Sequence, residues 1–362
     1  MSELDAAKKE ISFHLENLLK ASLFAGDAAR QAFIKWEKVI DFDQLDSASY
    51  QFLPKLYPNL QKLKIEHRLL PKIKGIYRKT WIENQLFTES LREVFSLLEE
   101  QKINLVVTSC VLRIARLEAD RNVFSLDGLT ISISATDAPT AIKLLRENGW
   151  LPDTDFDFRK IAPNDFVRLT KANQHHLVFN WLPNANFENL RQASEKINFA
   201  NKETNILSAE EQILQICRDE FLSVKKRDGR WIFFAYLILQ NKMRIDWKAV
   251  VAAAKNRRMC FALRLMLDYL REEFGASIPL EILNELKAAA KPKILSAVFP
   301  QNSLAAFESL RMTYRKQSMA SGKQPTFAGF YIFLQNHWNV TGVLPVAREI
   351  AQRLRQLRRI SF

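Results

Sequence analysis

The sequence predicts an α+β protein in which a small mixed sheet lies between two helical regions. Apolar residues recur every three or four positions through residues 2–101 and again from residue 208 onward, as in helices that bury one face. Residues 129–134 instead alternate between apolar and polar side chains, as in a half-buried strand. With 362 residues, of which 48% are apolar, the chain has room for more than one domain. We expect a helical N-terminal region over residues 1–101, an α/β core over 102–200 and a large all-helical domain over 201–362.

The helical N-terminal region should lead directly into the sheet. Pro54, Pro58, Pro71 and Gly75 are expected to interrupt its helices. The last of these helices is predicted from about Asn84 to Glu100, and a short apolar run begins three residues later. This helix and the first strand are therefore expected to pack as one unit.

The segment 103–134 is the predicted centre of the sheet. Its first part is an apolar run that ends in a turn of small residues, and its last part is the alternating strand. Successive side chains of a strand point to opposite faces, which separates the residues of this strand into two sets. The apolar face is formed by Leu129, Ile131 and Ile133, and the polar face by Thr130, Ser132 and Ser134.

A helix and a hairpin are predicted after this strand. Asp137 is a suitable N-cap for a helix that ends at Gly149, because a carboxylate can accept the unpaired amides of a first helical turn. Val167–Thr170 and His176–Trp181 are strand-like and are separated by four polar or small residues. They predict an antiparallel hairpin.

The C-terminal half should consist of helices with clear ends. Asp246 can accept the amide of Ala249 and so begin one helix. A second is predicted from Met259 to Phe274, with a stop at Gly275, and a third from Leu280 to Ala290.

Cysteine and histidine spacing does not predict a metal site. Cys110, Cys217 and Cys260 are far apart and lack a CxxC motif, which argues against structural zinc and disulfides and favours a reducing compartment. His175 and His176 are adjacent on an expected strand, so they would point to opposite faces and are interpreted as surface residues of the hairpin.

Charge and hydropathy indicate the class of partner and the location. The net charge is +13 and the pI is near 9.6, which favours anionic partners such as nucleic acid, nucleotides or an anionic membrane surface. The N-terminus lacks the apolar core of a signal peptide, and the longest apolar run, residues 231–239, is too short for a transmembrane helix. We therefore expect a cytoplasmic protein without a transmembrane segment.

The last helix carries the clearest basic feature. Apolar residues recur at helical spacing through residues 346–357, and the arginines Arg353, Arg355, Arg358 and Arg359 occupy the remaining surface. These arginines are candidate anion-binding residues for a phosphate backbone, an acidic partner or a membrane surface. A solvated face of a docked helix is the simpler interpretation.

Five weak motifs in a fixed order give a resemblance to a known family. They are SYQFLPKLYPNL, LREVFSLLEEQKINLVVTSCVLR, LDGLTISISATDAPTAIKLLRENGW, HHLVFNWLPN and the helical segment that contains RIDW. Over roughly residues 45–290 the chain resembles the bacterial uncharacterised nucleotidyltransferase family of the DNA-polymerase-β-like superfamily. The resemblance implies a nucleotidyltransferase-like sheet with flanking helices.

The resemblance also implies where a catalytic site would lie. In that superfamily two Mg²⁺ ions are held by carboxylates at positions i and i+2 of one strand and by a third carboxylate from a neighbouring strand. The family pattern places Gly128 and Thr130 at the first two positions and Val178 at the third. The Lys-Gly pair of the family falls on Ser109 and Cys110, and its hairpin histidine falls on Asn180. These positions are the vestigial nucleotide-site positions, together with Asp127, which a slip of one residue would bring to the first position.

The sequence therefore predicts a degenerate nucleotidyltransferase-like protein that binds a nucleotide, another anionic ligand or a protein partner without metal or cofactor. Whether it is an enzyme is left open. One alternative is an active transferase that uses NTP and Mg²⁺ with relocated acids, namely Asp120, Asp127 or Asp137. Another is a basic nucleic-acid-binding or assembly protein.

Overall fold

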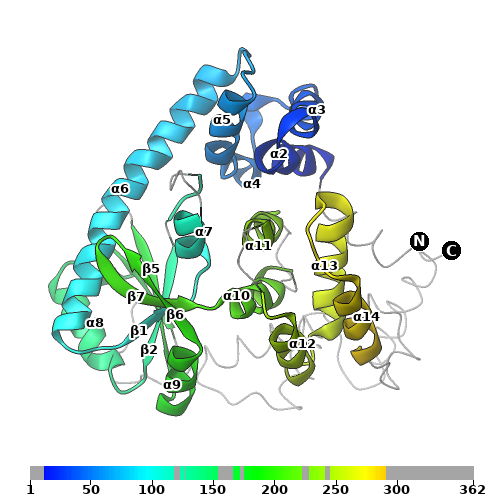
Figure 1. Cartoon of the computed structure of the whole chain (residues 1–362). Helices are drawn as coiled ribbons and strands as arrows, with labels where there is room; N and C mark the ends of the chain where they lie inside the picture. Colours follow the sequence, from blue (N-terminus) through cyan, green and yellow to red (C-terminus); the bar gives the residue numbers. More distant parts are fainter. Residues whose placement is uncertain are drawn as a thin grey trace, which may run out of the picture.

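The computed structural model describes residues 12–117, 123–126, 128–153, 166–171, 175–221, 228–240 and 245–290. A seven-stranded mixed sheet lies beside a group of C-terminal helices, and the N-terminal helices cap both at one end (Figure 1). The α+β class predicted from the sequence is confirmed. Within the described part of the chain, no helix is both long enough and apolar enough to cross a membrane.

The N-terminal helices are longer than the sequence suggested. They are α2 (Phe13–Leu23), α3 (Gly26–Glu37), the 3-10 turn η1 (Phe42–Gln44), α4 (Ser47–Tyr50), α5 (Leu53–Lys62) and α6 (Leu70–Glu100). The prediction that Pro58, Pro71 and Gly75 would interrupt the helices was wrong, because Pro58 lies inside α5 and the other two lie inside the 31-residue helix α6. Pro71 falls in the first helical turn, where its missing amide costs no hydrogen bond, and one glycine costs only about 1 kcal/mol.

The sheet has the strand order β3-β4-β5-β2-β1-β7-β6. Its strands are β1 (Leu105–Val107), β2 (Leu129–Ser134), β3 (Leu151–Pro152), β4 (Phe166–Thr170), β5 (His176–Leu182), β6 (Ser194–Phe199) and β7 (Lys202–Leu207). Strand β2 pairs with β5 in parallel and with β1 in antiparallel orientation, and β1 pairs with β7 in parallel. The predicted hairpin is confirmed as β4–β5, which is antiparallel.

The hairpin β6–β7 was not predicted. Charged residues such as Lys196 and Lys202 alternate with the buried residues Ile197, Phe199 and Ile206, which weakens the apolar signal of both strands. The two-residue turn, residues 200–201, has positive φ at both positions, 54° and 61°, as a turn that follows the twist of a hairpin requires.

Three helices connect the strands: α7 (Val111–Leu117), α8 (Ala138–Glu147) and α9 (Asn184–Gln192). Helix α8 is confirmed as predicted, and Gly149 follows it with a φ of +83°. Asp137 lies at the N-cap position of α8, but its side chain accepts no capping hydrogen bond. The start of the helix is instead set by Pro139 in its first turn.

The C-terminal region consists of helices as far as the structure describes it. They are α10 (Ala209–Ile216), the π-helical turn η2 (Cys217–Phe221), α11 (Arg230–Gln240), α12 (Trp247–Asn256), α13 (Cys260–Phe274) and α14 (Leu280–Ala289). The predicted cap of α12 is confirmed, since Asp246 Oδ1 accepts the amide of Ala249 at 3.0 Å. Gly275 ends α13 with a φ of +65°.

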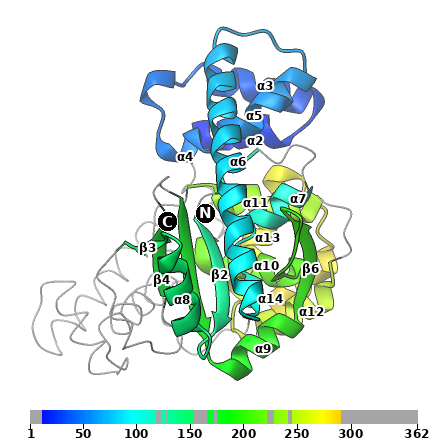
Figure 2. The ribbon, with the colours of Figure 1, turned by 90° about the vertical axis from the view of Figure 1, so that its left-hand side faces the viewer.

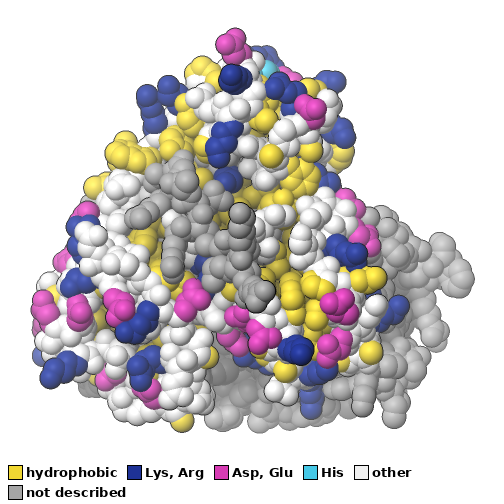
Figure 3. All heavy atoms as spheres, in the orientation of Figure 1, with side chains coloured by type: hydrophobic (Ala, Val, Ile, Leu, Met, Phe, Trp, Pro, Cys, Tyr) yellow, Lys and Arg dark blue, Asp and Glu magenta, His cyan; other side chains and the backbone are white. Residues whose placement is uncertain are grey.

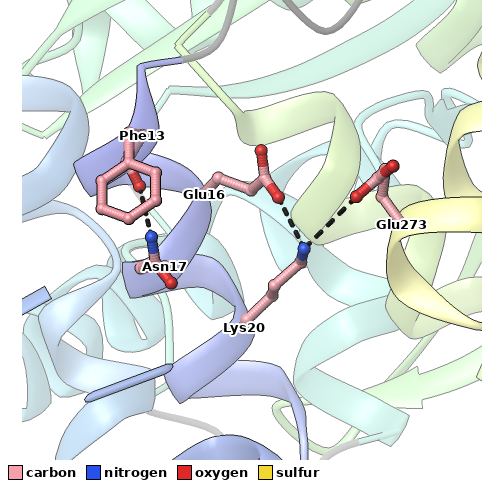
Figure 4. A network of polar contacts seen from close by, with 5 residues as sticks. All are labelled: Phe13, Glu16, Asn17, Lys20 and Glu273. Carbon is pink, nitrogen blue, oxygen red and sulfur yellow. Dashed lines mark hydrogen bonds and ion pairs between the residues drawn. The ribbon is translucent and has the colours of Figure 1, made fainter. Parts of the chain in front are cut away.

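The apolar interior has two main parts. One is shared by the N-terminal helices and α10–α14, and it includes Leu18, Trp36, Trp231 and Leu263. The other lies between the sheet and the helices α6 and α8. On the surface, Lys20 joins α2 to α13, because its Nζ lies 2.5 Å from Glu16 Oε1 and 3.4 Å from Glu273 Oε2 (Figure 4).

A buried arginine connects the sheet to the C-terminal helices. Arg113 of α7 is 1% exposed, and its Nε donates to Gln212 Oε1 of α10 at 2.6 Å. Its Nη1 lies 2.8 Å from Glu195 Oε1 of β6, and its Nη2 donates to the carbonyl oxygen of Leu207, at the end of β7. One guanidinium thus satisfies acceptors on three elements, which suits its planar set of donors.

We predict that Arg113→Met lowers the free energy of unfolding by about 3 kcal/mol, because it leaves the acceptors of a buried charge without their donor. The matched control is Arg191→Met, which removes an exposed pair with Glu188 and should cost less than about 1 kcal/mol. Urea denaturation followed by circular dichroism measures both. Equal midpoints for the two variants would contradict the role of Arg113.

Candidate functional site

The two faces of β2 meet different surroundings. Leu129, Ile131 and Ile133 lie in one apolar cluster with residues from α6 and α8, including Val94 and Ile142. Figure 2 views the molecule from the side on which α6 and α8 lie over the sheet. The residues that alternate with them, Thr130, Ser132 and Ser134, point to the opposite face, which is the polar face of the sheet.

Sheet register brings together several of the predicted positions. Thr130 of β2 is the direct partner of Val178 on β5, so the two side chains are neighbours on the polar face. The amide of Thr108, just after β1, donates to the carbonyl oxygen of Thr130 at 2.9 Å. On β4, Arg168 is the direct partner of Val178. Thr108, Thr130, Val178 and Arg168 therefore form one row across three strands and the residue that follows β1, and we call it the site row.

The turn after β1 reaches this row from one side. Ser109 Oγ accepts the amide of Thr130 at 3.3 Å, so this serine lies against the predicted second metal position. Cys110 is half-buried and packs against the core that the N- and C-terminal helices share. The structure therefore brings Ser109, but not Cys110, to the site row.

The central pair of the next row is a hydroxyl and an amide that bond to each other, with Val106 and Phe166 on the two outer strands. Ser132 Oγ donates to Asn180 Oδ1 at 2.6 Å, and Ser132 is only 1% exposed. Asn180 is the position at which the resemblance expects a histidine. Beyond it, the hydroxyl of Ser134 lies 2.7 Å from Asn184 Oδ1 and 2.7 Å from Thr136 Oγ1. The polar face near β2 is thus held by neutral hydrogen bonds.

Gly128 has a backbone conformation that disfavours a side chain. Its φ is +80°, and its amide donates to the carbonyl oxygen of His176 at 3.2 Å. A Cβ at this position would meet no atom within 4 Å, so the obstacle to a side chain is backbone strain and not lack of space.

The segment before Gly128 is fixed from α6. Asn84, which is buried, donates from Nδ2 to the carbonyl oxygen of Phe124 at 2.9 Å and accepts the amide of Leu126 at 3.0 Å. This pair of bonds holds the chain at a defined place one residue before the predicted position Asp127. Asp127 itself and Asp120 lie outside the described residues, as do Arg353, Arg355, Arg358 and Arg359.

Asp137 lies at the other end of β2 from the site row. Four residues separate Thr130 from Ser134, which corresponds to about 13 Å along a strand, and Asp137 follows beyond them. Partial burial raises the pKa of its carboxyl group above the ordinary value. Its distance from Thr130 and Val178 argues against a role as a relocated ligand of the same metal pair.

The residues of the site row do not fit a pair of magnesium ions. Mg²⁺ prefers an octahedron of oxygens that includes carboxylates, whereas Thr130 offers one hydroxyl, Val178 none and Gly128 no side chain. Among the residues that the structure describes, no three His, Cys, Asp or Glu side chains are placed to hold a metal ion.

Three residues on β4 and β5 extend the polar face, and of these Arg168 and Phe166 were not singled out in the sequence. Arg168 has a side chain that is 60% exposed, with its Nε 3.8 Å from Asp153 Oδ2. Phe166, the partner of Asn180, is 65% exposed, and His176 Nδ1 lies 3.0 Å from Thr170 Oγ1. They share this face because of the register in which β4 pairs with β5. The sequence did not give this register, so it could not place these residues at the site.

The adjacent histidines are separated as predicted but differ in burial. His176 lies on the polar face, whereas His175 is buried beside α6, with its Nδ1 3.2 Å from Ser90 Oγ and its ring 5.1 Å from that of Phe87. The interpretation of His175 as a surface residue was wrong. The helix α6 covers this end of the hairpin, which the sequence of the hairpin does not reveal.

Comparison with models of protein families assigns the chain to one family. A family model described as "Uncharacterised nucleotidyltransferase" matches residues 47–275, which is more than half of the sequence. The chain belongs to this family. The resemblance inferred from the order of motifs is thereby confirmed over almost the whole of its expected range.

Two solved structures are similar to parts of this nucleotidyltransferase family member. The lincosamide antibiotic adenylyltransferase LnuA in its lincomycin-bound form is 14% identical, with a TM-score of 0.32, over 42% of this chain and 96% of that chain. An antigenic nucleotidyltransferase-like protein from Paracoccidioides brasiliensis is 11% identical, with a TM-score of 0.31, over 49% and 92%. A search of curated protein sequences finds no match.

We predict opposite effects for two glycine substitutions that both point into open space. Gly128→Ala should destabilise the protein by about 1 kcal/mol because of its positive φ, whereas Gly75→Ala in the interior of α6 should stabilise it by about 1 kcal/mol. Thermal unfolding of both variants measures this. A Gly128→Ala variant as stable as the parent would show that this backbone readily accepts a side chain.

Proposed function

We propose that this chain is a catalytically degenerate member of the nucleotidyltransferase family that binds an anionic ligand at the site row without metal. One observation carries the proposal. Thr130 and Val178 are direct partners on neighbouring parallel strands, at the positions where the family pattern expects carboxylates, and neither can replace a carboxylate as a ligand of Mg²⁺.

The conformation of Gly128 supports the same conclusion. An active relative would need a carboxylate at this position, but the backbone here has a φ of +80°. Only glycine, and to a lesser degree asparagine and aspartate, adopts this region readily. A carboxylate-bearing residue at position 128 would therefore be strained in this backbone.

A positive charge on the same face supports ligand binding without metal. Arg168 lies in the site row, next to Val178, and its guanidinium is exposed. Its Nε lies 3.8 Å from Asp153 Oδ2, and the other guanidinium nitrogens can donate to an incoming anion. Arg168 can neutralise a phosphate or carboxylate by paired hydrogen bonds. Phe166, two residues away on the same face, offers an exposed ring to an apolar or aromatic part of the ligand.

We also propose that the chain has no resident cofactor. As predicted from the sequence, we propose that the protein is cytoplasmic. A nucleotide is the first ligand to test, because the chain belongs to a nucleotidyltransferase family. The other partners expected from the sequence, nucleic acid or a protein bound through the basic C-terminal arginines, remain predictions.

Calorimetry of the full chain with ATP, GTP, CTP and UTP, each with and without Mg²⁺, tests the proposed function. We predict that any nucleotide that binds does so with the same affinity in both conditions, because no carboxylate pair is available to couple metal and phosphate. Arg168→Ala should weaken this binding about tenfold, through the loss of a charge-assisted hydrogen bond.

The matched control is Arg146→Ala, which removes an arginine of α8 from the opposite side of the sheet and should leave binding unchanged. Binding that appears only with Mg²⁺ would contradict the proposal and favour an active transferase. A complete lack of nucleotide binding in both conditions would exclude nucleotides as the anionic ligand.

A further inference from the structure

Helix α6 forms an exposed ridge along one edge of the molecule (Figures 1 and 2). Its first turns pack on α5, and its last turns pack on the sheet and α8. Between these two supports, the outer side of the helix carries Trp81, Ile82 and Leu86, which are 47%, 52% and 49% exposed. Ile82 and Leu86 are four residues apart, so they lie on one face of the helix, and Trp81 flanks them. We call these three residues the α6 patch.

Charges of opposite sign lie on the two sides of the α6 patch. The exposed residues before it are basic and include Lys74, Arg78 and Lys79. Those after it are mostly acidic and include Glu89 and Glu100. Lys79 and Glu89 both have side chains that are 63% exposed. In Figure 3, Asp and Glu also gather over the lower part of the molecule, away from the N-terminal helices.

The charged and apolar residues along α6 are complementary to those of a second α6 that runs in the opposite direction. Lys79 lies five residues before residue 84, and Glu89 lies five residues after it. Ile82 lies two before, and Leu86 two after. A second α6 that runs in the opposite direction, with residue 84 of each helix at the same level, would place each lysine near a glutamate and each isoleucine near a leucine. A parallel arrangement would place like charges together.

We propose that the α6 patch is the contact between two copies of this chain, which pair through antiparallel α6 helices about a two-fold axis at the level of residue 84. In this contact Ile82 and Leu86 of each copy bury each other, and Lys79 of each copy pairs with Glu89 of the other. Such a contact is isologous and closed, so it gives a dimer and no larger assembly.

We expect the dimer to be weak, because its contact area is small. A single pair of helices buries less than about 1,200 Å² in total, which is the range of transient complexes. The existing partners of the charged residues do not prevent it, because they lie on the same helix: Lys79 Nζ is 3.7 Å from Glu83 Oε1, and Glu89 pairs with Arg92. Exposed pairs of this kind exchange at little cost.

Sedimentation velocity of the full chain over a wide concentration range tests the proposal. We expect a monomer–dimer equilibrium whose dissociation constant rises at least tenfold in Leu86→Asp, since this variant places a carboxylate in the apolar contact. Lys79→Glu should weaken the dimer similarly, because it faces Glu89 of the other copy. The double variant Lys79→Glu with Glu89→Lys should restore the dimer, since each pair is then reversed in sign.

The matched control is Leu280→Asp, at an exposed leucine of α14 outside the α6 patch, which should leave the equilibrium unchanged. Circular dichroism of each variant checks that it is folded. A chain that stays monomeric at every concentration would overturn the proposal. This is the result expected if another segment of the chain or a different protein covers the α6 patch. A dimer that Lys79→Glu leaves intact, or that the double variant does not restore, would also overturn it.

Discussion

The alternation of β2 between an apolar and a polar face is the constraint on which the rest of the structure depends. Leu129, Ile131 and Ile133 must be buried, and they bring α6 and α8 onto one side of the sheet. The same alternation directs Thr130 and Ser132 to the other side, next to Val178 and Asn180 of β5. Burial of apolar side chains contributes most of the stabilisation of such a sheet, at about 25 cal/mol per Å². The main apolar core uses one face of β2, so Thr130 on the other face, which is only half-buried, is not needed to fill that core. Ser132 and Ser134, on the same face as Thr130, are buried beside α9.

Under the proposed function, this separation explains how a member of a nucleotidyltransferase family keeps the sheet with Gly128, Thr130 and Val178 at the positions where the family pattern expects carboxylates. A carboxylate on the polar face costs stability, since neighbouring acids repel each other and need cations. Neutral groups avoid this cost, as Ser132 and Asn180 do in the next row, where the hydroxyl donates to the amide oxygen at 2.6 Å. In the proposed site a side chain supplies the positive charge instead of a metal, and Arg168 is that side chain in the site row.

The sequence predicted the parts of the fold that local signals determine. Alternation predicts the strand β2 and the hairpin β4–β5, Asp246 predicts the start of α12, and Gly275 predicts the end of α13. Each signal lies within or next to the element that it determines. The hairpin β6–β7 and the full length of α6 were not predicted, because tertiary contacts override their local signals. Of the candidate site, the neighbourhood of Ser109, Thr130 and Val178 could be inferred through the family pattern. Arg168 and Phe166 could not, because only the register of β4 on β5 places them there.

The most direct test of the metal-free site uses manganese as a paramagnetic probe. Mn²⁺ and ATP are added to isotope-labelled protein, and the amide signals of Thr130, Val178 and Asn180 are compared with those of Val250 and Ala254, which are buried in α12. If the site row holds no divalent metal, signals of both groups should lose the same small fraction of their intensity. Selective broadening of the Thr130, Val178 and Asn180 signals would show that a metal binds there and would contradict the account.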